Sequence, residues 1–144
     1  MAVYLKDKIR NIAVIGHSGE GKTSLVEAIL YKTKAIERLG KVDEGNTTSD
    51  YDQEEIARGM SISLSLAYTD HKGYKLNIID VPGFFDFEGE MISALSVADT
   101  AIIVTMASGT LTVGTEKAID YCLEKGVPMY LFVNGVNKEN TDYF

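Results

Sequence analysis

The sequence has 144 residues, of which 45% are hydrophobic and 24% charged, and its formal net charge is −7. This composition predicts one folded domain rather than a disordered chain, and the acidity argues against a nonspecific grip on nucleic acid phosphates. The single cysteine excludes an internal disulfide and a cysteine-based zinc cluster. No apolar run approaches the roughly 18 residues of a membrane span. The charged segment 1–10 is not a secretory signal.

The first half of the sequence predicts a strand, a helix, a long loop and a hairpin. The nearly all-apolar run 11–16 (NIAVIG) is typical of a buried strand, and apolar residues recur at helical spacing over 22–32. The polar, acidic stretch 36–59 lacks a clear period and is interpreted as a loop. Apolar and polar residues alternate over 61–68, and a short turn joins this predicted strand to a second one over 74–81.

The second half of the sequence alternates between helices and strands. Segments 88–97 and 114–124 predict helices, and Gly126 is well placed to cap the second one. The apolar segments 100–106 and 127–133 predict strands. The resulting order, β-α-β-β-α-β-α-β, implies an α/β fold with a mainly parallel sheet, helices on both faces and one antiparallel strand, the second.

A glycine-rich motif lies between the first predicted strand and the first predicted helix. Its sequence, GHSGEGKT, matches the pattern G-x-x-x-x-G-K-[ST]. Glycines let backbone N–H groups turn inward around a β-phosphate, and the helix N-terminus adds partial positive charge. We expect Lys22 to bridge the β- and γ-phosphates in a catalytic role, and Thr23 to place its hydroxyl on Mg²⁺. The nucleotide-binding residues predicted from this motif are Gly16, His17, Ser18, Gly19, Glu20, Gly21, Lys22, Thr23 and Ser24.

The alternative to a phosphate site is a glycine-rich turn that only caps a helix, and the strand and helix on either side disfavour it. For the side chain of His17 we favour local packing over catalysis.

A second motif, Asp80-Val81-Pro82-Gly83, ends the strand that precedes it. Alone it fits an ordinary turn, but beside a phosphate loop in a parallel sheet it predicts Asp80 as an Mg²⁺ ligand, usually through water, and the N–H of Gly83 as a donor to the γ-phosphate.

Together these residues resemble the G domain of a translational GTPase of the elongation factor G family, over nearly the whole chain from Ile12 to Phe144. The similarity is closest to the elongation-factor-G-like paralogue branch, whose phosphate loop has the form GHSGxGKTSL, found here at 16–25. Further segments that resemble this branch are 38–42 (RLGKV), 49–52 (SDYD), 85–87 (FDF) and 113–117 (VGTEK). The resemblance implies a three-layer P-loop NTPase sandwich that binds GTP or GDP with Mg²⁺.

The resemblance also implies two switch segments, switch I at about 36–62 and switch II at about 80–90. The family pattern R-G-[IM]-[ST]-I falls on 58–62, which makes Ser61 the second hydroxyl ligand of Mg²⁺, beside Thr23 and Asp80. The family usually has threonine there. The alternative for Ser61 is an outward-facing polar residue on an alternating strand.

Two departures from the family pattern concern the chemistry. Phe84 stands where translational GTPases usually have the histidine that orients the attacking water, and a phenyl ring neither donates nor accepts that hydrogen bond. Phe84 therefore occupies the catalytic position without the catalytic group. The alternative roles for its side chain are a hydrophobic lid over the site or simple packing. The guanine-reading motif N-K-x-D falls on 134–137, where it has become Asn-Gly-Val-Asn. We predict nucleotide contacts from Asn134 and Asn137 with weakened guanine specificity; a second register, 137–140, restores the lysine but lies too far from the strand.

The function expected from the resemblance is that of a cytoplasmic, nucleotide-dependent switch that acts on the ribosome, mostly through parts outside this chain. One alternative is a degenerate nucleotide-binding module without efficient hydrolysis or guanine specificity, and another is a P-loop ATPase. We expect no membrane binding and no direct DNA binding. Residues 1–144 are expected to form a partial G domain that stops before the family's sixth strand, with the fifth strand as an exposed edge.

Overall fold

The computed structural model describes residues 3–48, 63–83, 88–107 and 110–137, and within them five strands form one sheet in the order β2-β3-β1-β4-β5. The strands are β1 (Ile9–Ile15), β2 (Ser65–His71), β3 (Tyr74–Asp80), β4 (Thr100–Met106) and β5 (Met129–Asn134). The α-helices are α1 (Lys22–Lys32), α3 (Glu88–Val97) and α4 (Val113–Lys125), and 3-10 turns span Lys6–Lys8 and Val42–Glu44.

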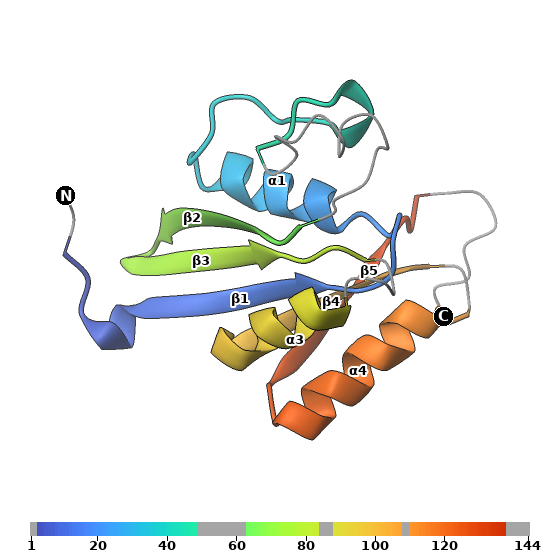
Figure 1. Cartoon of the computed structure of the whole chain (residues 1–144). Coiled ribbons are helices and arrows are strands. Elements are labelled where there is room, and N and C mark those ends of the chain that lie inside the picture. The colour runs from blue at the N-terminus through green and yellow to red at the C-terminus, as the bar shows by residue number, and fades with distance from the viewer. Residues whose placement is uncertain (1–2, 49–62, 84–87, 108–109, 138–144) are drawn as a thin grey trace.

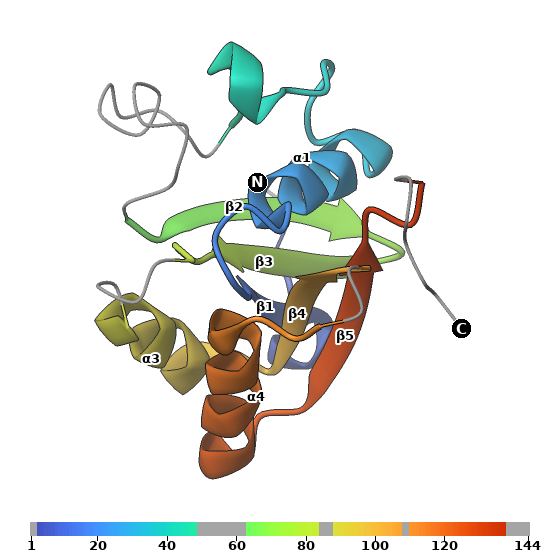
Figure 2. The same ribbon diagram turned by 90° about the vertical axis from the view of Figure 1, so that its right-hand side faces the viewer.

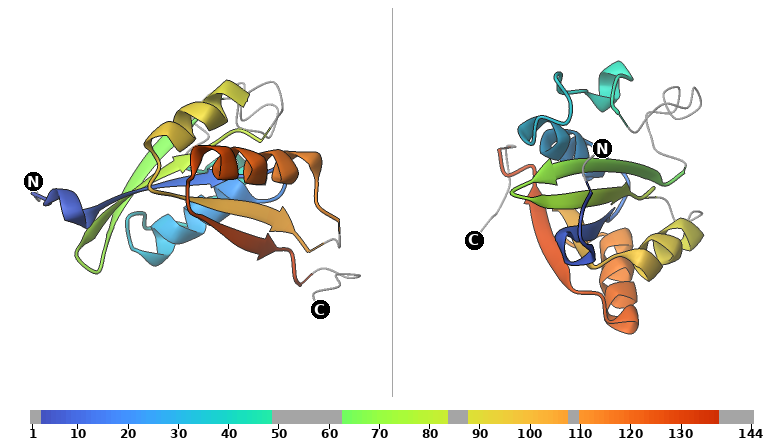
Figure 3. Two further views of the ribbon diagram at one scale, coloured as in Figure 1. Left: turned by 90° about the horizontal axis from the view of Figure 1, so that it is seen from below. Right: turned by 90° about the vertical axis from the view of Figure 1, so that its left-hand side faces the viewer.

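The sheet is mainly parallel, as the order of elements predicts. β1 pairs in parallel with both β3 and β4, β4 pairs in parallel with β5, and β2 alone runs antiparallel, against β3. Helix α1 lies on one face of the sheet and helices α3 and α4 on the other (Figure 1). The view from below has α3 and α4 on one side of the strands and α1 on the other, so the molecule has three layers (Figure 3).

Two hydrophobic clusters hold the layers together, one on each face of the sheet. Successive residues of β1 point to opposite faces, so Val14 packs under α1 while Ala13 and Ile15 pack against α3 and α4. Burial on both faces explains why the run 11–16 is nearly all apolar rather than alternating. A fully buried side chain such as Leu30 of α1 contributes about 1.5–3 kcal/mol of hydrophobic stabilisation.

The predicted boundaries of α1, α3 and β4 agree with the structure, and other elements shift by a few residues. β1 begins at Ile9 rather than Asn11 because Ile9 and Arg10 continue the parallel backbone ladder with Lys75 and Leu76 of β3. β2 runs Ser65–His71 rather than 61–68, and residues 61 and 62 lie outside the described residues. β5 begins at Met129 rather than Val127 because the N–H of Val127 donates to Cys122 O and closes α4.

Among the described strands, β5 lies at one edge of the sheet. Its residues Tyr130 and Phe132 pair with Ile102 and Val104, which belong to the face covered by α1. Within the described residues, the two aromatic side chains of this strand are 69% and 40% exposed. The part of that face over β4 and β5 is therefore thinly covered. No helix in the described part of the chain is long and apolar enough to cross a membrane.

Candidate functional site

The glycine-rich loop connects the central strand β1 to the N-terminus of α1. Figure 2 views the molecule from the side where β1 and β3 end, and the blue loop between β1 and α1 crosses the middle of this view. Gly16 and Gly21 have φ angles of 137° and 93°, in the region that favours glycine. A Cβ on Gly16 would lie 2.3 Å from Val104 O, and one on Gly21 would lie 2.3 Å from Asn134 Nδ2. Glycine therefore lets this loop wrap against the ends of β4 and β5.

The side chain of Lys22 forms a hydrogen bond across the glycine-rich loop. Its ammonium donates a 2.8 Å hydrogen bond to His17 O, and the side chain is buried. Burial lowers the pKa of Lys22, while the carboxylates of Asp80 and Glu20 act in the opposite direction. The α1 N-cap is Gly21, so no cap side chain competes for the N–H groups of the first helical turn. A desolvated ammonium and helical N–H groups without a cap side chain together suit an anion such as a phosphate.

The two predicted metal-binding motifs meet beside this loop. Thr23 Oγ1 donates a 2.8 Å hydrogen bond to Asp80 Oδ2, and the Asp80 side chain is buried. Parallel pairing of β1 with β3 brings them together, because it sets Val14 opposite Asp80. A hydroxyl that donates to a carboxylate still offers lone pairs to a hard cation such as Mg²⁺. Ser61, the third predicted ligand, lies outside the described residues, and among those described no group of three or more His, Cys, Asp or Glu gathers as a metal centre.

Gly83 lies directly against the glycine-rich loop. A Cβ there would lie 2.3 Å from Lys22 Nζ and 2.6 Å from Ser18 N. The end of β3 and the glycine-rich loop are thus in contact, as their positions in a parallel sheet predict. Phe84, the next residue, lies outside the described residues.

Of the segment 134–137, which is predicted to contact the base, Asn134 contacts the glycine-rich loop. Asn134 Nδ2 donates to Glu20 O at 2.9 Å, which ties the end of β5 to the loop. Gly135 is buried with a φ of 72°, and Asn137 lies exposed in the turn that follows. Of the other predicted nucleotide-binding residues, Gly19 lies exposed in the loop and Ser24 lies exposed on α1.

The first turn of α4 packs against the glycine-rich loop. A Cβ on Gly114 would lie 2.7 Å from His17 Nδ1 and 3.0 Å from His17 Cα. This close approach supports the packing interpretation of the His17 side chain. The Glu20 side chain contacts the same turn of α4: Thr112 Oγ1 donates to Glu20 Oε1 at 3.0 Å, and Thr115 Oγ1 donates to Glu20 Oε2 at 3.0 Å.

Sequence reasoning missed two buried carboxylates. It placed Glu20 in the loop through its backbone and assigned its side chain nothing, and it did not single out Glu27. Glu27, on α1, is 1% exposed and accepts hydrogen bonds from Gly40 N at 3.0 Å and Thr48 N at 2.5 Å. Glu27 therefore fastens the early part of the predicted switch I to α1. The only local sign that Glu27 is buried is its place among the regularly spaced apolar residues of the helix.

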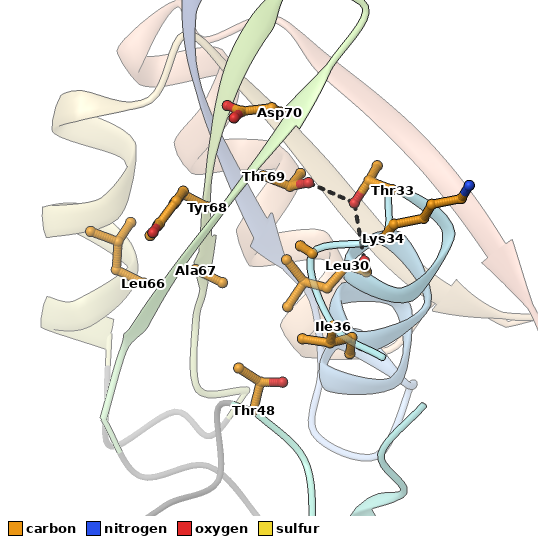
Figure 4. Close-up of a pocket in the computed structure, with 11 residues that line it drawn as sticks. Leu30, Thr33, Lys34, Ile36, Thr48, Leu66, Ala67, Tyr68, Thr69 and Asp70 are labelled. Carbon is orange, nitrogen blue, oxygen red and sulfur yellow. Dashed lines mark hydrogen bonds between the residues drawn. The ribbon is translucent and has the colours of Figure 1, made fainter. Parts of the chain in front are cut away.

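A separate hollow of about 420 Å³ lies between the end of α1 and β2. Figure 4 shows Leu30 and Ile36 on one side of β2 and Leu66 and Tyr68 pointing away from them on the other. Thr69 Oγ1 donates to Thr33 Oγ1 at 2.6 Å within it. None of its lining residues belongs to the glycine-rich loop or to the end of β3, so it is distinct from the candidate phosphate site.

Comparison with known proteins gives the same family along nearly the whole chain. The family described as the elongation factor Tu GTP binding domain matches residues 7–143. An elongation factor G-like protein of Mycobacterium tuberculosis is 35% identical over 94% of this chain and 19% of its own length. An elongation factor G of Thermotoga petrophila is 40% identical over 96% of this chain and 20% of its own length. The chain thus spans about a fifth of the length of these curated relatives.

Solved structures agree with this comparison. A crystal structure of a Thermus thermophilus protein superposes with a TM-score of 0.83 at 40% identity, covering 88% of this chain and 19% of that one. A bacterial selenocysteine-specific elongation factor superposes with a TM-score of 0.68 at 26% identity, over the same shares of the two chains. The three-layer fold predicted from the resemblance is therefore confirmed.

Proposed function

The chain belongs to the family of elongation factor Tu GTP binding domains, and on this premise we propose that it binds GTP and GDP with Mg²⁺ and works as a nucleotide-dependent switch. The observation that carries the proposal is the Lys22 ammonium held across the loop, 2.8 Å from His17 O, with the Thr23–Asp80 pair beside it. An ammonium and a hydroxyl at the N-terminus of α1, together with a carboxylate at the end of β3, suit a nucleoside triphosphate bound with Mg²⁺.

In this proposal the glycine-rich loop, the end of β3 and switch I each have a separate role in binding the nucleotide. Backbone N–H groups of the loop and of the first turn of α1 hold the β-phosphate. Lys22 neutralises charge between the β- and γ-phosphates, and the N–H of Gly83 reaches toward the γ-phosphate. Thr23 and Asp80, joined by Ser61 of switch I, hold Mg²⁺, which would neutralise charge on the β- and γ-phosphate oxygens.

The residues expected to contact the base favour weaker recognition of guanine. Asn134 orders the loop by its bond to Glu20 O, and Asn137 replaces the aspartate that would accept from two guanine N–H groups. An amide accepts through its oxygen but presents N–H₂ toward the second donor. We therefore propose that guanine is bound with reduced selectivity relative to family members that keep the aspartate.

Hydrolysis and the ribosome are the remaining parts of the proposal. We propose that the protein is cytoplasmic and that its partner is the ribosome, because the chain is similar to elongation factors. Phe84 lacks the water-orienting group, so we propose slow intrinsic hydrolysis. The second candidate, a degenerate binding module that does not turn over GTP, is favoured by Phe84 and by the altered base-reading motif.

Two measurements on the purified chain test the proposal. The first is competition of GTP, ATP and xanthosine triphosphate for one labelled nucleotide, with Lys22→Ala as the variant expected to lose binding. A failure of all three nucleotides to bind would refute the proposal, and equal binding of ATP and GTP would point to an ATPase. The second is single-turnover release of phosphate from GTP with and without ribosomes. Ribosome-stimulated release would rule out the degenerate module.

A further inference from the structure

The carboxylate of Glu20 is 3% exposed, and it lies inside the loop that would surround phosphates. Burying a carboxylate away from water is costly unless hydrogen bonds or a cation compensate for the lost hydration. Here both oxygens have partners: Oε2 accepts from His17 N and Thr115 Oγ1, and Oε1 accepts from Thr112 Oγ1, each at 3.0 Å. The charge also lies near Lys22, whose pKa it raises against the effect of burial.

Hydrogen bonds to the side chain and backbone of Glu20 connect the loop to α4 and to β5. The bond from His17 N closes the loop upon itself, and the bonds from Thr112 and Thr115 join it to the start of α4. Thr112 is the N-cap of that helix, so the carboxylate also lies at the positive end of the helix dipole. The backbone of the same residue is held from β5, because Asn134 Nδ2 donates to Glu20 O at 2.9 Å.

A second contact between α4 and the loop supports this link. Gly114 lies so close to His17 that a Cβ would come within 2.7 Å of its imidazole and 3.0 Å of its Cα. The first turn of α4 therefore meets the loop at two points, one by hydrogen bonds and one by packing. Any displacement of α4 relative to β1 must either break these contacts or move the loop.

We propose that Glu20 is a positioning residue for the bound nucleotide: its side chain holds the phosphate loop in its binding shape against α4 and so sets the rate at which nucleotide leaves. The inference rests on the proposed binding of nucleotide at this loop. Glu20 acts through backbone N–H groups of the loop and touches no phosphate itself. Its contribution comes from hydrogen bonds, so an uncharged side chain of the same shape keeps most of it.

The test is the dissociation rate of a fluorescent GDP, measured by stopped flow with Mg²⁺ at a temperature where circular dichroism shows each protein folded. Glu20→Ala removes three hydrogen bonds and is expected to raise the dissociation rate about tenfold or more, since each such bond contributes modestly on its own. Glu20→Gln keeps an acceptor for His17 and a donor for Thr112, so it is expected to stay within about threefold of the wild type.

A partner outside the loop keeps the test sharp if Glu20→Ala does not fold. Thr115→Val has the same shape as threonine and is expected to speed dissociation. Where Glu20→Ala does fold, the double variant Glu20→Ala/Thr115→Val is expected to add nothing to it, because both changes remove one network. Thr69→Val is the matched control. It removes a buried hydroxyl that donates to Thr33 Oγ1 at 2.6 Å in the hollow between α1 and β2, which no residue of the loop lines, and it should leave the rate unchanged.

The possible failures point to different conclusions. Unchanged dissociation in folded Glu20→Ala and Thr115→Val, or equally fast dissociation in Glu20→Ala and Glu20→Gln, would overturn the positioning role. The second of these results would mean that only the negative charge matters. A wild-type chain that binds no labelled GDP at all would overturn the proposed function as well.

Discussion

The hydroxyl of Thr23 donates a 2.8 Å hydrogen bond to the carboxylate of Asp80, which joins the first turn of α1 to the end of β3. A hydroxyl that donates this bond keeps its lone pairs for the Mg²⁺ that we propose binds here. Asp80→Asn keeps an acceptor for Thr23 and removes the charge. Because changes to such supporting groups cost about 10- to 100-fold in metal affinity, we expect Mg²⁺ to support GTP binding that much less well in this variant.

The measurement is a titration of Mg²⁺ against GTP binding in wild type and Asp80→Asn. Thr23→Ser keeps the hydroxyl and is the control, expected to stay within about threefold of the wild type, since it loses only the methyl that restricts the rotamer. Identical Mg²⁺ curves for wild type and Asp80→Asn would remove Asp80 from the metal site.

A substitution at Gly83 tests the contact between the end of β3 and the glycine-rich loop. A Cβ at this position would lie 2.3 Å from Lys22 Nζ and 2.6 Å from Ser18 N, so Gly83→Ala must displace the ammonium or the loop. We expect GTP affinity to fall by about tenfold or more, which corresponds to roughly 1.4 kcal/mol or more. Gly89→Ala in α3 is the matched control, because a Cβ there meets nothing within 4 Å. Equal GTP affinities in the two variants would contradict the geometry.

Much of the fold could be predicted because its signals are local. The spacing of apolar residues locates α1 and α3, and the turn before Tyr74 locates the hairpin. The glycine-rich loop is predictable because a particular backbone path needs glycine at fixed positions. The position of Asp80 beside it follows from parallel pairing of β1 with β3.

The buried carboxylates could not be predicted because their partners are distant in sequence. Glu20 finds Thr115 only through the packing of α4 on the sheet, and Glu27 finds Gly40 through the path of a loop without periodicity. Element ends also depend on partners: β1 extends to Ile9 because β3 offers a ladder there. Local propensity carries no information on such pairs, and tertiary contacts override it.

Glu27 is expected to be a strong determinant of stability. Its carboxylate accepts from Gly40 N and Thr48 N while 1% exposed. Glu27→Ala leaves both N–H groups without this acceptor, and each unsatisfied buried group costs about 1–3 kcal/mol. We expect the free energy of unfolding to fall by about 2–4 kcal/mol in urea titrations, allowing for water that reaches the loop.

The control for this prediction is Glu44→Gln. Glu44 forms exposed ion pairs with Arg38 and Lys41, and such pairs contribute little because water screens them. Its urea midpoint should match that of the wild type. If Glu27→Ala also unfolds at the wild-type midpoint, the buried acceptor has no stabilising role.

Asn137 allows a test of the base-reading register. Asn137→Asp restores the acceptor for two guanine N–H groups, and a charge-assisted bond contributes about 1.5–3 kcal/mol, or one to two decades in affinity. We expect GTP to bind about 10- to 100-fold more tightly and xanthosine triphosphate to gain nothing. Gly135→Lys is a poorer test, because Gly135 is buried with a φ of 72°. Unchanged GTP affinity in Asn137→Asp would count against this register.

Cys122 predicts a pH dependence of stability. Its thiol is buried on the inner face of α4, and burial raises its pKa above the ordinary value of 9.0. The folded state therefore favours the neutral thiol. The resulting stabilisation is complete below pH 9.0 and is lost as the pH rises through the higher folded pKa, because the unfolded chain then binds fewer protons than the folded one. We expect the difference in unfolding free energy between wild type and Cys122→Ala to be constant below this pH and to shrink above it. A difference that stays constant through alkaline pH would mean that the folded thiol ionises as readily as the unfolded one.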